Sequence, residues 1–503
     1  MRRPILVFPL LVLASVALSA EPVNSQLWGE NGEKWTPESR LPDFSFAGYH
    51  CGESGIPTPS VVVNVRDFGA KGDGAQDDTQ AFIRAIKAAE KGAVLVPAGR
   101  YLITDMVEIR KPNIVLRGEG PGKSVLFFPK SLEQVKSLRE ATTSGLPTSG
   151  YSWSGGFLKV QGKNSGAQLG NVKMSAKRGS NVIELAKAAT VQPGQRIEIS
   201  QEDPGDRSLL NYLYAQQSDS ISKIGKTAID FVARVTRVDG AKLTLDRPLR
   251  TDVRPEWKTR VRIYAPSVTE VGIENLTFEF PETPYMGHFT EQGFNPLTFT
   301  GDVSDCWARD LTIINADSGP FIQGCFNTVE NIVFESKRKP DKAGNTGHHG
   351  FSFDGDDNLL RNFDIRTRFI HDISVSHCGG NVASQGKAVD LAFDHHRRYP
   401  HANLFTSIDI GAGTRMYNSG GGDSLGKHSA AWTTFWNIRA ARPQSWPPSK
   451  FGPDLMNLVG VISQDPPQLG SNGRWFEPVP PTQLQPANLY EAQLAKRRVR
   501  PAP

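Results

Sequence analysis

The chain has 503 residues and a formal charge of +5, with 57 lysines and arginines against 52 aspartates and glutamates. So small a net charge does not predict a nucleic-acid partner on electrostatics alone. Four cysteines are too few for a disulfide-based scaffold. The length exceeds the usual size of one compact core, so we expect an elongated architecture or two domains.

The first 20 residues have the pattern of a secretory signal peptide. Two arginines precede an apolar run over 4–17, and small residues follow up to position 20. The run is shorter than the ~20 apolar residues of a spanning helix, and no later stretch approaches that length. We expect residues 1–20 to be removed, which leaves a secreted or periplasmic protein without a membrane span; a membrane anchor is the alternative. Residues 21–60 are an N-terminal extension.

Beyond position 60 the chain opens with a strand, a Gly-rich turn, a helix and a further strand. The aspartate pair before Thr79 can cap a helix over 79–90, in which Phe82, Ile83 and Ile86 fall on one side. A LysGly turn then leads into the strands AVLVP and GRYLI. These elements form a compact opening unit.

The stretch DFGAKGDGAQDDT, residues 67–79, resembles the N-terminal signature of the pectate lyase superfamily of right-handed parallel β-helices. That superfamily holds pectate lyases, polygalacturonases, rhamnogalacturonases and many phage tailspikes. The resemblance covers residues 60–130 and carries no catalytic residue. It implies an all-β fold, a right-handed parallel β-helix, in which the helix over 79–90 caps the open end of the solenoid.

Short segments of one kind recur along the chain and support a solenoid independently. Each is a polar residue followed by alternating apolar residues, the period of a half-buried strand. The segments are NIVLRG at 113, NLTFEF at 275, DLTIIN at 310, NIVFES at 331, NFDIRT at 362, DISVSH at 372, SIDIGA at 407 and NIRAAR at 437. Their spacing of about 20 to 35 residues suits coils with loops of different length. A β-sandwich is the structural alternative.

These patterns divide the mature chain into four parts. Residues 61–164 are expected to hold the capping helix and the first rungs. Residues 165–265 contain hairpin patterns with ProGly and AspGly turns, which predict a β-rich insertion subdomain. Residues 266–441 hold the remaining rungs and the site. Residues 442–503 are Pro-rich and end in a helical pattern, which we interpret as an extended tail along the solenoid and a terminal helix that closes it.

Seven of the ten histidines lie between residues 348 and 401. Histidine changes its charge near neutral pH, so this clustering indicates a proton-transfer site. Strand alternation directs Asp394 and His396 outward beside the core-facing Phe393, and it directs Asp372 outward in the neighbouring segment. The alternative for His395 is a core position, and HisHisArgArg at 395–398 could be a solvated basic loop.

Two groups of candidate site residues follow. The predicted catalytic residues are His396, Arg397, Asp394, His349, His371 and Asp372. The predicted substrate-binding residues are Arg398, Lys387, Asp354, Tyr285, His288 and Arg415. We expect His396 and Arg397 on the surface, where the imidazole takes a proton and the guanidinium holds a carboxylate.

The sequence assigns no cofactor and leaves Ca²⁺ as the open alternative. Asp354, Asp356 and Asp357 could hold Ca²⁺ through oxygen ligands, or they could be turn residues around a glycine. The histidines could in principle hold zinc, but there is no HExxH or similar motif, so no metal ligand is assigned. Cys306 and Cys325 could pair or could be buried free thiols.

The resemblance and the cluster together predict a monomeric enzyme acting on a polysaccharide. Basic and imidazole groups favour cleavage of an acidic, uronate-containing polymer by β-elimination. Glycoside hydrolysis with paired aspartates is one alternative. A non-catalytic carbohydrate-binding or adhesin role is the other, since this fold also carries such proteins.

Overall fold

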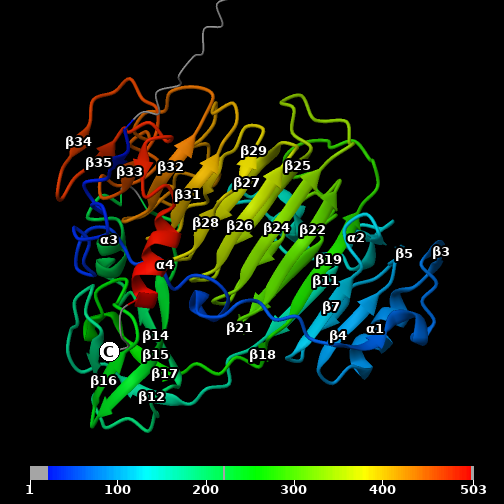
Figure 1. Ribbon diagram of the computed structural model, residues 1–503, viewed down its shortest axis with the longest axis horizontal. Coiled ribbons are helices and arrows are strands. Elements are labelled where there is room, and N and C mark those ends of the chain that lie inside the picture. Colours follow the sequence, from blue (N-terminus) through cyan, green and yellow to red (C-terminus); the bar gives the residue numbers. More distant parts are fainter. Residues whose placement is uncertain (1–20, 219–220, 500–503) are drawn as a thin grey trace, which may run out of the picture.

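The protein is a parallel β-helix in a computed structural model that describes residues 21–218 and 221–499. The coils stack from the end that carries α1 (Thr79–Ala88) towards the end that carries β35 (Trp475–Glu477), as Figure 1 shows. The predicted all-β, right-handed parallel β-helix is confirmed. The predicted signal peptide lies outside the described residues.

One long sheet runs the length of the solenoid, and its neighbouring strands pair in parallel. Its main row consists of β2 (Val61–Asn64), β4 (Gly92–Val96), β7 (Ile114–Gly118), β19 (Gly272–Glu279), β22 (Trp307–Ile314), β24 (Thr328–Glu335), β26 (Leu359–Ile365), β28 (Val382–Ser384), β31 (Leu404–Asp409), β32 (Thr434–Arg439), β33 (Asn457–Val459) and β35. Four further strands pair in parallel alongside this row: β3 (Asp73–Asp77), β5 (Gly99–Leu102), β8 (Ser124–Phe127) and β29 (Lys387–Ala388).

The polar residue of the recurring segments has a structural reason. In seven of the eight segments it adopts a positive φ, at Asn113, Asn275, Asp310, Asn331, Asn362, Ser407 and Asn437. Asparagine and aspartate tolerate this left-handed conformation better than other side chains with a Cβ. The backbone therefore turns at that residue, and the alternating apolar residues after it form the next stretch of strand.

A second parallel sheet carries the histidines. Its seven strands, in spatial order, are β30 (Phe393–His395), β27 (Phe369–Val375), β25 (Gly347–Phe353), β23 (Phe321–Ile322), β20 (Leu297–Gly301), β11 (Leu158–Gly162) and β6 (Val107–Ile109). Parallel pairing places Ser374 of β27 opposite Asp394 of β30, and His349 of β25 opposite His371 of β27. Side chains from three successive coils thus meet at one place.

The core between the sheets is apolar and stacked. Phe393, Phe405 and Phe435 come from successive coils, and their ring centroids lie 4.6 to 5.3 Å apart. Each such side chain stabilises the fold by roughly 1.5–3 kcal/mol relative to exposure. His395 lies against these rings at 0% exposure, which agrees with the core alternative for that residue. All four cysteines are free and buried, including Cys306 and Cys325.

Residues between β11 and β19 form a six-stranded antiparallel sheet beside the solenoid (Figure 1). Its strands, in spatial order, are β12 (Gln168–Asn171), β17 (Arg260–Ile263), β14 (Arg196–Glu202), β15 (Ala228–Asp239), β16 (Lys242–Leu245) and β13 (Val182–Glu184). The sheet has its own apolar cluster. It is joined to the solenoid by a buried contact in which Arg247 and Arg250 bind Asp357.

The interpretation of the C-terminal part was wrong in two respects. β33 and β35 continue the long sheet as further rungs, so residues 457–477 do not form an extended tail along it. Helix α4 (Leu489–Val499) does not close the end but lies on the outer face of the sheet, as Figure 1 shows. Its Leu489 and Tyr490 pack with Trp28 of the N-terminal extension and with outward side chains such as Leu404.

Helix α1 starts at the expected Thr79 and ends two residues before the expected end. Its Phe82 and Ile86 are buried in the main core, as the apolar side of the sequence pattern predicts. Its role as a cap stays a prediction. Across the described ranges, no helix is long and apolar enough to span a membrane.

Candidate active site

A pocket of about 610 Å³ lies over β25 and β27. This volume is in the usual range for small-molecule sites. Its floor includes His348, His349, Ser374, His396 and Arg398. Its walls come from four separate segments: the hairpin of β9 (Arg139–Ala141) and β10 (Pro147–Ser149), the loop with His288 and Phe289, the loop 421–425, and Lys223 of the insertion.

Asp394 is the centre of the polar contacts below this floor. Its side chain is inaccessible to solvent, accepts hydrogen bonds from the Ser374 hydroxyl and the Gly420 N–H at 2.7 Å each, and lies 3.0 Å from Nδ1 of His396. Burial opposes its ionisation, but His371 and His396 outweigh burial and hold the pKa of Asp394 well below its usual range. Asp394 is therefore a carboxylate that accepts every one of these bonds.

The carboxylate sets the state of His396. Burial alone would lower the pKa of His396, but the charge and hydrogen bond of Asp394 raise it above the ordinary value. When the ring is neutral, Nδ1 carries the proton that Asp394 accepts, so Nε2 is left with a free lone pair. The His396 side chain is 36% exposed, and it lines the pocket. A base of this kind can take a proton from a bound molecule.

His349 and His371 break the strand alternation. They occupy register positions that match the core-facing Phe351 and Ile373, yet Nδ1 of His349 lies 2.8 Å from the Ser374 hydroxyl on the outward side. The backbone passes very close between the two strands at Gly350, where a Cβ would lie 2.3 Å from the carbonyl oxygen of Asp372. Burial lowers the pKa of His371 to about 4, so both imidazoles are neutral near pH 7.

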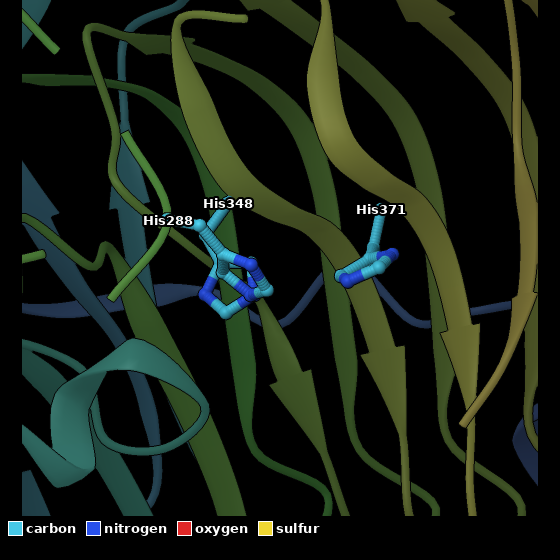
Figure 2. Close-up of side chains that lie close together, drawn as sticks. All are labelled: His288, His348 and His371. Atoms are coloured by element: carbon cyan, nitrogen blue, oxygen red, sulfur yellow. The ribbon is translucent and has the colours of Figure 1, made fainter. Parts of the chain in front are cut away.

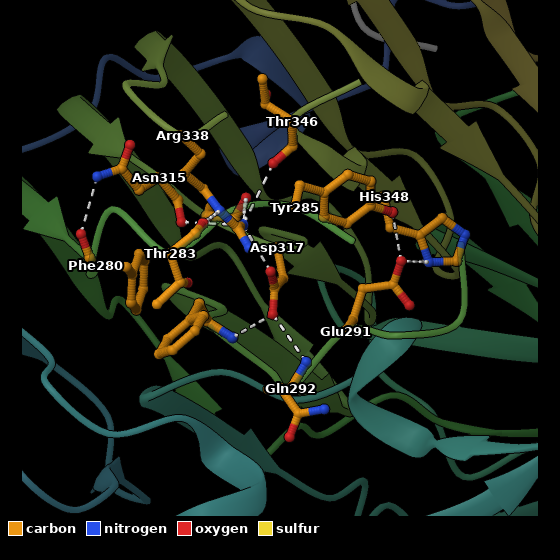
Figure 3. Close-up of polar contacts among 12 residues, drawn as sticks. Phe280, Thr283, Tyr285, Glu291, Gln292, Asn315, Asp317, Arg338, Thr346 and His348 are labelled. Atoms are coloured by element: carbon orange, nitrogen blue, oxygen red, sulfur yellow. Dashed lines mark hydrogen bonds and ion pairs between the residues drawn. The ribbon is translucent and has the colours of Figure 1, made fainter. Parts of the chain in front are cut away.

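A buried network lies behind His348 and includes Tyr285 (Figure 3). The Tyr285 hydroxyl donates to Glu291 at 2.5 Å, and the other Glu291 oxygen accepts from the Ser152 hydroxyl at 2.9 Å. Oε1 of Glu291 lies 3.5 Å from Nδ1 of His348. Burial raises the pKa of Glu291 to about 7. Tyr285 is 3% exposed, so the structure places it behind the pocket wall, whereas its loop neighbour His288 lines the pocket.

Two predicted basic residues, Arg397 and Lys387, lie away from the pocket. Arg397 is buried and donates to the carbonyl of Gly421 at 3.0 Å and to Asp423 at 2.6 Å, so the expected surface position was wrong. The backbone at 397, 398 and 399 has positive φ, and strand alternation cannot be extended through such a turn. Lys387 lies in the long sheet and pairs with Asp364 at 3.4 Å.

Asp372 and Arg415 form a buried ion pair at 2.5 Å. Asp372 also accepts the N–H groups of Ala392 and Phe369, and Arg415 also donates to the Phe369 carbonyl. Asp372 is 1% exposed and does not point outward as alternation predicts; it lies beside the close backbone approach at Gly350. The pair thus ties the strand ends of neighbouring coils together below the surface.

The three aspartates considered for Ca²⁺ do not face one another. Asp354 lines the pocket, and burial raises its pKa to about 6. Asp356 accepts the Gly379 N–H at 2.6 Å, and Asp357 binds Arg247 at 2.8 Å and Arg250. Two of the three carboxylates are thus bound by hydrogen-bond donors and arginines, and the geometry does not favour a shared Ca²⁺.

The sequence predictions omitted several residues of the site. Ser374 has the outward parity of Asp394 and could have been chosen on that ground. His348 belongs to the histidine cluster and lies in the floor of the pocket, but it is not among the predicted site residues. Glu291 and the wall residue Trp153 come from irregular segments, where no periodicity indicates the direction of a side chain.

Residues 62–200 match the protein family described as "Rhamnogalacturonase A/epimerase, pectate lyase-like". Among curated proteins of Azotobacter vinelandii, Alginate lyase 7 is 44% identical over 72 residues, which cover 12% of this chain and 8% of that protein. Mannuronan C5-epimerase AlgE1 is 33% identical over 138 residues, which cover 25% and 10%. The chain therefore spans about a tenth of the length of these curated relatives.

Comparison with solved structures gives matches at low identity and with TM-scores below 0.5. The tailspike protein gp49 of Pseudomonas phage LKA1 is 14% identical with a TM-score of 0.44, over 80% of this chain and 64% of that one. An exopolygalacturonase from Thermotoga maritima is 12% identical with a TM-score of 0.29, over 80% and 92%. The resemblance to the pectate lyase superfamily, first indicated by residues 67–79, is confirmed by the family match over residues 62–200.

Proposed function

We propose that the protein is a carbohydrate-active enzyme that cleaves an acidic, uronate-containing polysaccharide by β-elimination in this pocket. One observation carries the proposal: the ionised Asp394 orients His396 as a base, and the exposed Arg398 lines the same pocket. A guanidinium matches a carboxylate in bidentate geometry. The names of the relatives, an alginate lyase and a mannuronan epimerase, support an acidic polymer.

The proposed reaction needs three events at one sugar unit. Arg398 binds the uronate carboxylate and makes the neighbouring C5 proton more acidic. Nε2 of His396 takes that proton, the electrons of the C5–H bond form a C4=C5 double bond, and the C4–O bond breaks. The proton passes from His396 to the leaving oxygen, so the imidazole returns to its starting state and the products are an unsaturated end and a new hydroxyl.

Hydrolysis is less well supported by the pocket. It requires two carboxyl groups on opposite sides of a glycosidic bond. Asp394 is inaccessible to solvent and already accepts hydrogen bonds from its donors. The carboxyl groups that line the pocket are Asp354 and Glu140, and Glu140 accepts a hydrogen bond from Nε1 of Trp153 at 3.0 Å. Epimerisation is an alternative to elimination that would begin with the same residues. A proton would return to C5 from the opposite face, and the C4–O bond would stay intact.

The test uses the full chain with polymannuronate, polyguluronate, polygalacturonate and a neutral glucan. Elimination gives ultraviolet absorbance from the unsaturated product together with new reducing ends. Reducing ends alone would mean hydrolysis, and deuterium incorporation at C5 without cleavage would mean epimerisation. Binding without cleavage or deuterium incorporation would mean a binding protein. Each of these three results would reject the proposal. We expect His396→Ala to lower kcat by at least ~100-fold. His50→Ala, a histidine paired with Glu270 outside the pocket, is the matched control.

A further inference from the structure

Three histidines from separate segments lie close together, and two of them, His288 and His348, line the pocket. His288 comes from the loop between β19 and β20, His348 from β25 and His371 from β27. Each offers a ring nitrogen, and the three nitrogens lie within 4.8 Å of one another. In Figure 2 a ring nitrogen of His371 faces the other two imidazoles. The three side chains therefore converge on a common space.

Two of these imidazoles are buried without hydrogen bonds. His348 is 1% exposed and His371 is 5% exposed, and neither ring nitrogen of either residue has a hydrogen-bond partner among residues 21–218 and 221–499. A buried polar group without a partner costs roughly 1–3 kcal/mol. Four such nitrogens in one place indicate that a ligand satisfies some of them.

A carboxyl group lies close to Nδ1 of each buried imidazole, His348 and His371. Oε1 of Glu291 lies 3.5 Å from Nδ1 of His348, and Oδ1 of Asp394 lies 3.7 Å from Nδ1 of His371. Histidines that bind metals usually donate their second N–H to such a carboxylate, which fixes the tautomer and makes the first nitrogen a better ligand. Each of the two rings therefore has one nitrogen beside a carboxylate and a second nitrogen that can serve as the metal ligand.

We propose that His288, His348 and His371 bind one divalent transition-metal ion of the zinc class, with a fourth position open to the pocket. Three neutral imidazoles suit zinc and its neighbours, whereas Ca²⁺ and Mg²⁺ require oxygen ligands. Two nitrogens on one tetrahedral ion at 2.0–2.1 Å would lie about 3.4 Å apart. Binding therefore needs a small inward movement, which the exposed loop of His288 can supply.

A second set of groups is less suited to hold the ion. His371, Asp394 and His396 also have ligand atoms within 4.8 Å of one another. Asp394, however, already accepts three hydrogen bonds, one of them from His396. Asp394 and His396 thus have hydrogen-bond partners without a metal, whereas neither ring nitrogen of His348 or His371 has a hydrogen bond within the described part of the chain. The proposal concerns binding alone and does not depend on the proposed elimination.

The experiment titrates chelator-treated full chain with Zn²⁺ in competition with a chromophoric chelator, and repeats the titration with Co²⁺. We expect one ion per chain, a visible Co²⁺ spectrum of tetrahedral type, and no displacement by a large excess of Ca²⁺. His288→Ala and His348→Ala should each raise Kd about 100-fold or more, and Glu291→Gln should raise it about 10–100-fold. His377→Ala, a pocket histidine outside the trio, should leave Kd unchanged.

Several outcomes would overturn the proposal. Absence of stoichiometric Zn²⁺ binding would do so, as would equal Kd values for the parent chain and His288→Ala. The His288 variant keeps the test decisive even when His348→Ala fails to fold, because His288 is exposed. Since no turnover is measured, failure of the metal site leaves the proposed elimination to be judged by its own assay.

Discussion

Replacing Asp394 by asparagine tests how the proposed base is oriented. The substitution keeps the shape of the side chain and can keep the hydrogen bond that Oδ1 accepts from the Gly420 N–H. At the other position an NH₂ group replaces the oxygen that now faces His396 and Ser374. The amide donates to Nδ1 of His396, so the proton of the ring moves to Nε2. The imidazole then has no lone pair directed at the substrate.

The effect should appear in the rate and not in substrate binding. Loss of a positioned base lowers kcat by about 10²–10⁴-fold, which corresponds to about 2.7–5.4 kcal/mol in the activation free energy. KM should stay within a few fold, because Arg398 and the pocket walls are unchanged. The Ser374 hydroxyl can accept from the new amide and donate to His349, so the hydrogen bonds near the floor remain satisfied.

The measurement is steady-state kinetics on the polymer that the parent chain cleaves best, with thermal unfolding in parallel. Asp364→Asn, which changes a carboxylate paired with Arg366 on the outer surface, is the matched control. A variant at position 394 that keeps more than a tenth of the parent kcat would refute the assignment of His396 as a base oriented by Asp394.

Two further predictions concern the parts that hold the site. Asp357→Asn leaves Arg247 and Arg250 buried without a countercharge and should lower the free energy of unfolding by about 3–5 kcal/mol, seen in thermal unfolding. Burial opposes ionisation of Asp357, but the two arginines outweigh burial and lower the pKa of Asp357. This contribution to stability is therefore present above about pH 3.9 and is lost as the pH falls through the folded pKa. A stability difference between variant and parent that persists unchanged at lower pH would contradict the assignment. Arg397→Ala should loosen the loop 421–428 and raise KM while kcat stays within about tenfold of the parent value. A loss of kcat comparable to that of His396→Ala would mean that Arg397 takes part in catalysis.

The fold could be predicted from local signals because most rungs of the long sheet repeat one of them. The motif at residues 67–79 and the recurring polar residue, such as Asn331 or Asn362, both mark positions where the backbone must turn. The length of the last rungs could not be predicted in this way, because Gly460 takes the turning position that Asn437 has in the preceding coil and prolines interrupt the stretch that follows. The Pro-rich composition therefore indicates an extended tail where the chain forms further rungs.

Part of the site could be predicted from strand alternation. Alternation places Asp394 and Ser374 on one side, and parallel register brings them opposite each other. It fails for Asp372, beside the close approach at Gly350, and for Arg397, which follows the end of its strand in a left-handed turn. The contact between His348 and Glu291 depends on the path of a long loop, for which the sequence has no periodic signal.

The pocket combines a floor from adjacent rungs with walls from four segments that are distant in the sequence. Backbone hydrogen bonds between coils hold the floor, whereas the wall segments leave the solenoid and return to it. A change of length in the hairpin 139–149 or in the loop 421–425 would therefore reshape the cavity without moving Asp394 or His396. Selection for a different polymer could act on the walls while the proton-transfer groups stay as they are, so closely similar floors with dissimilar walls are what we expect among relatives that differ in substrate.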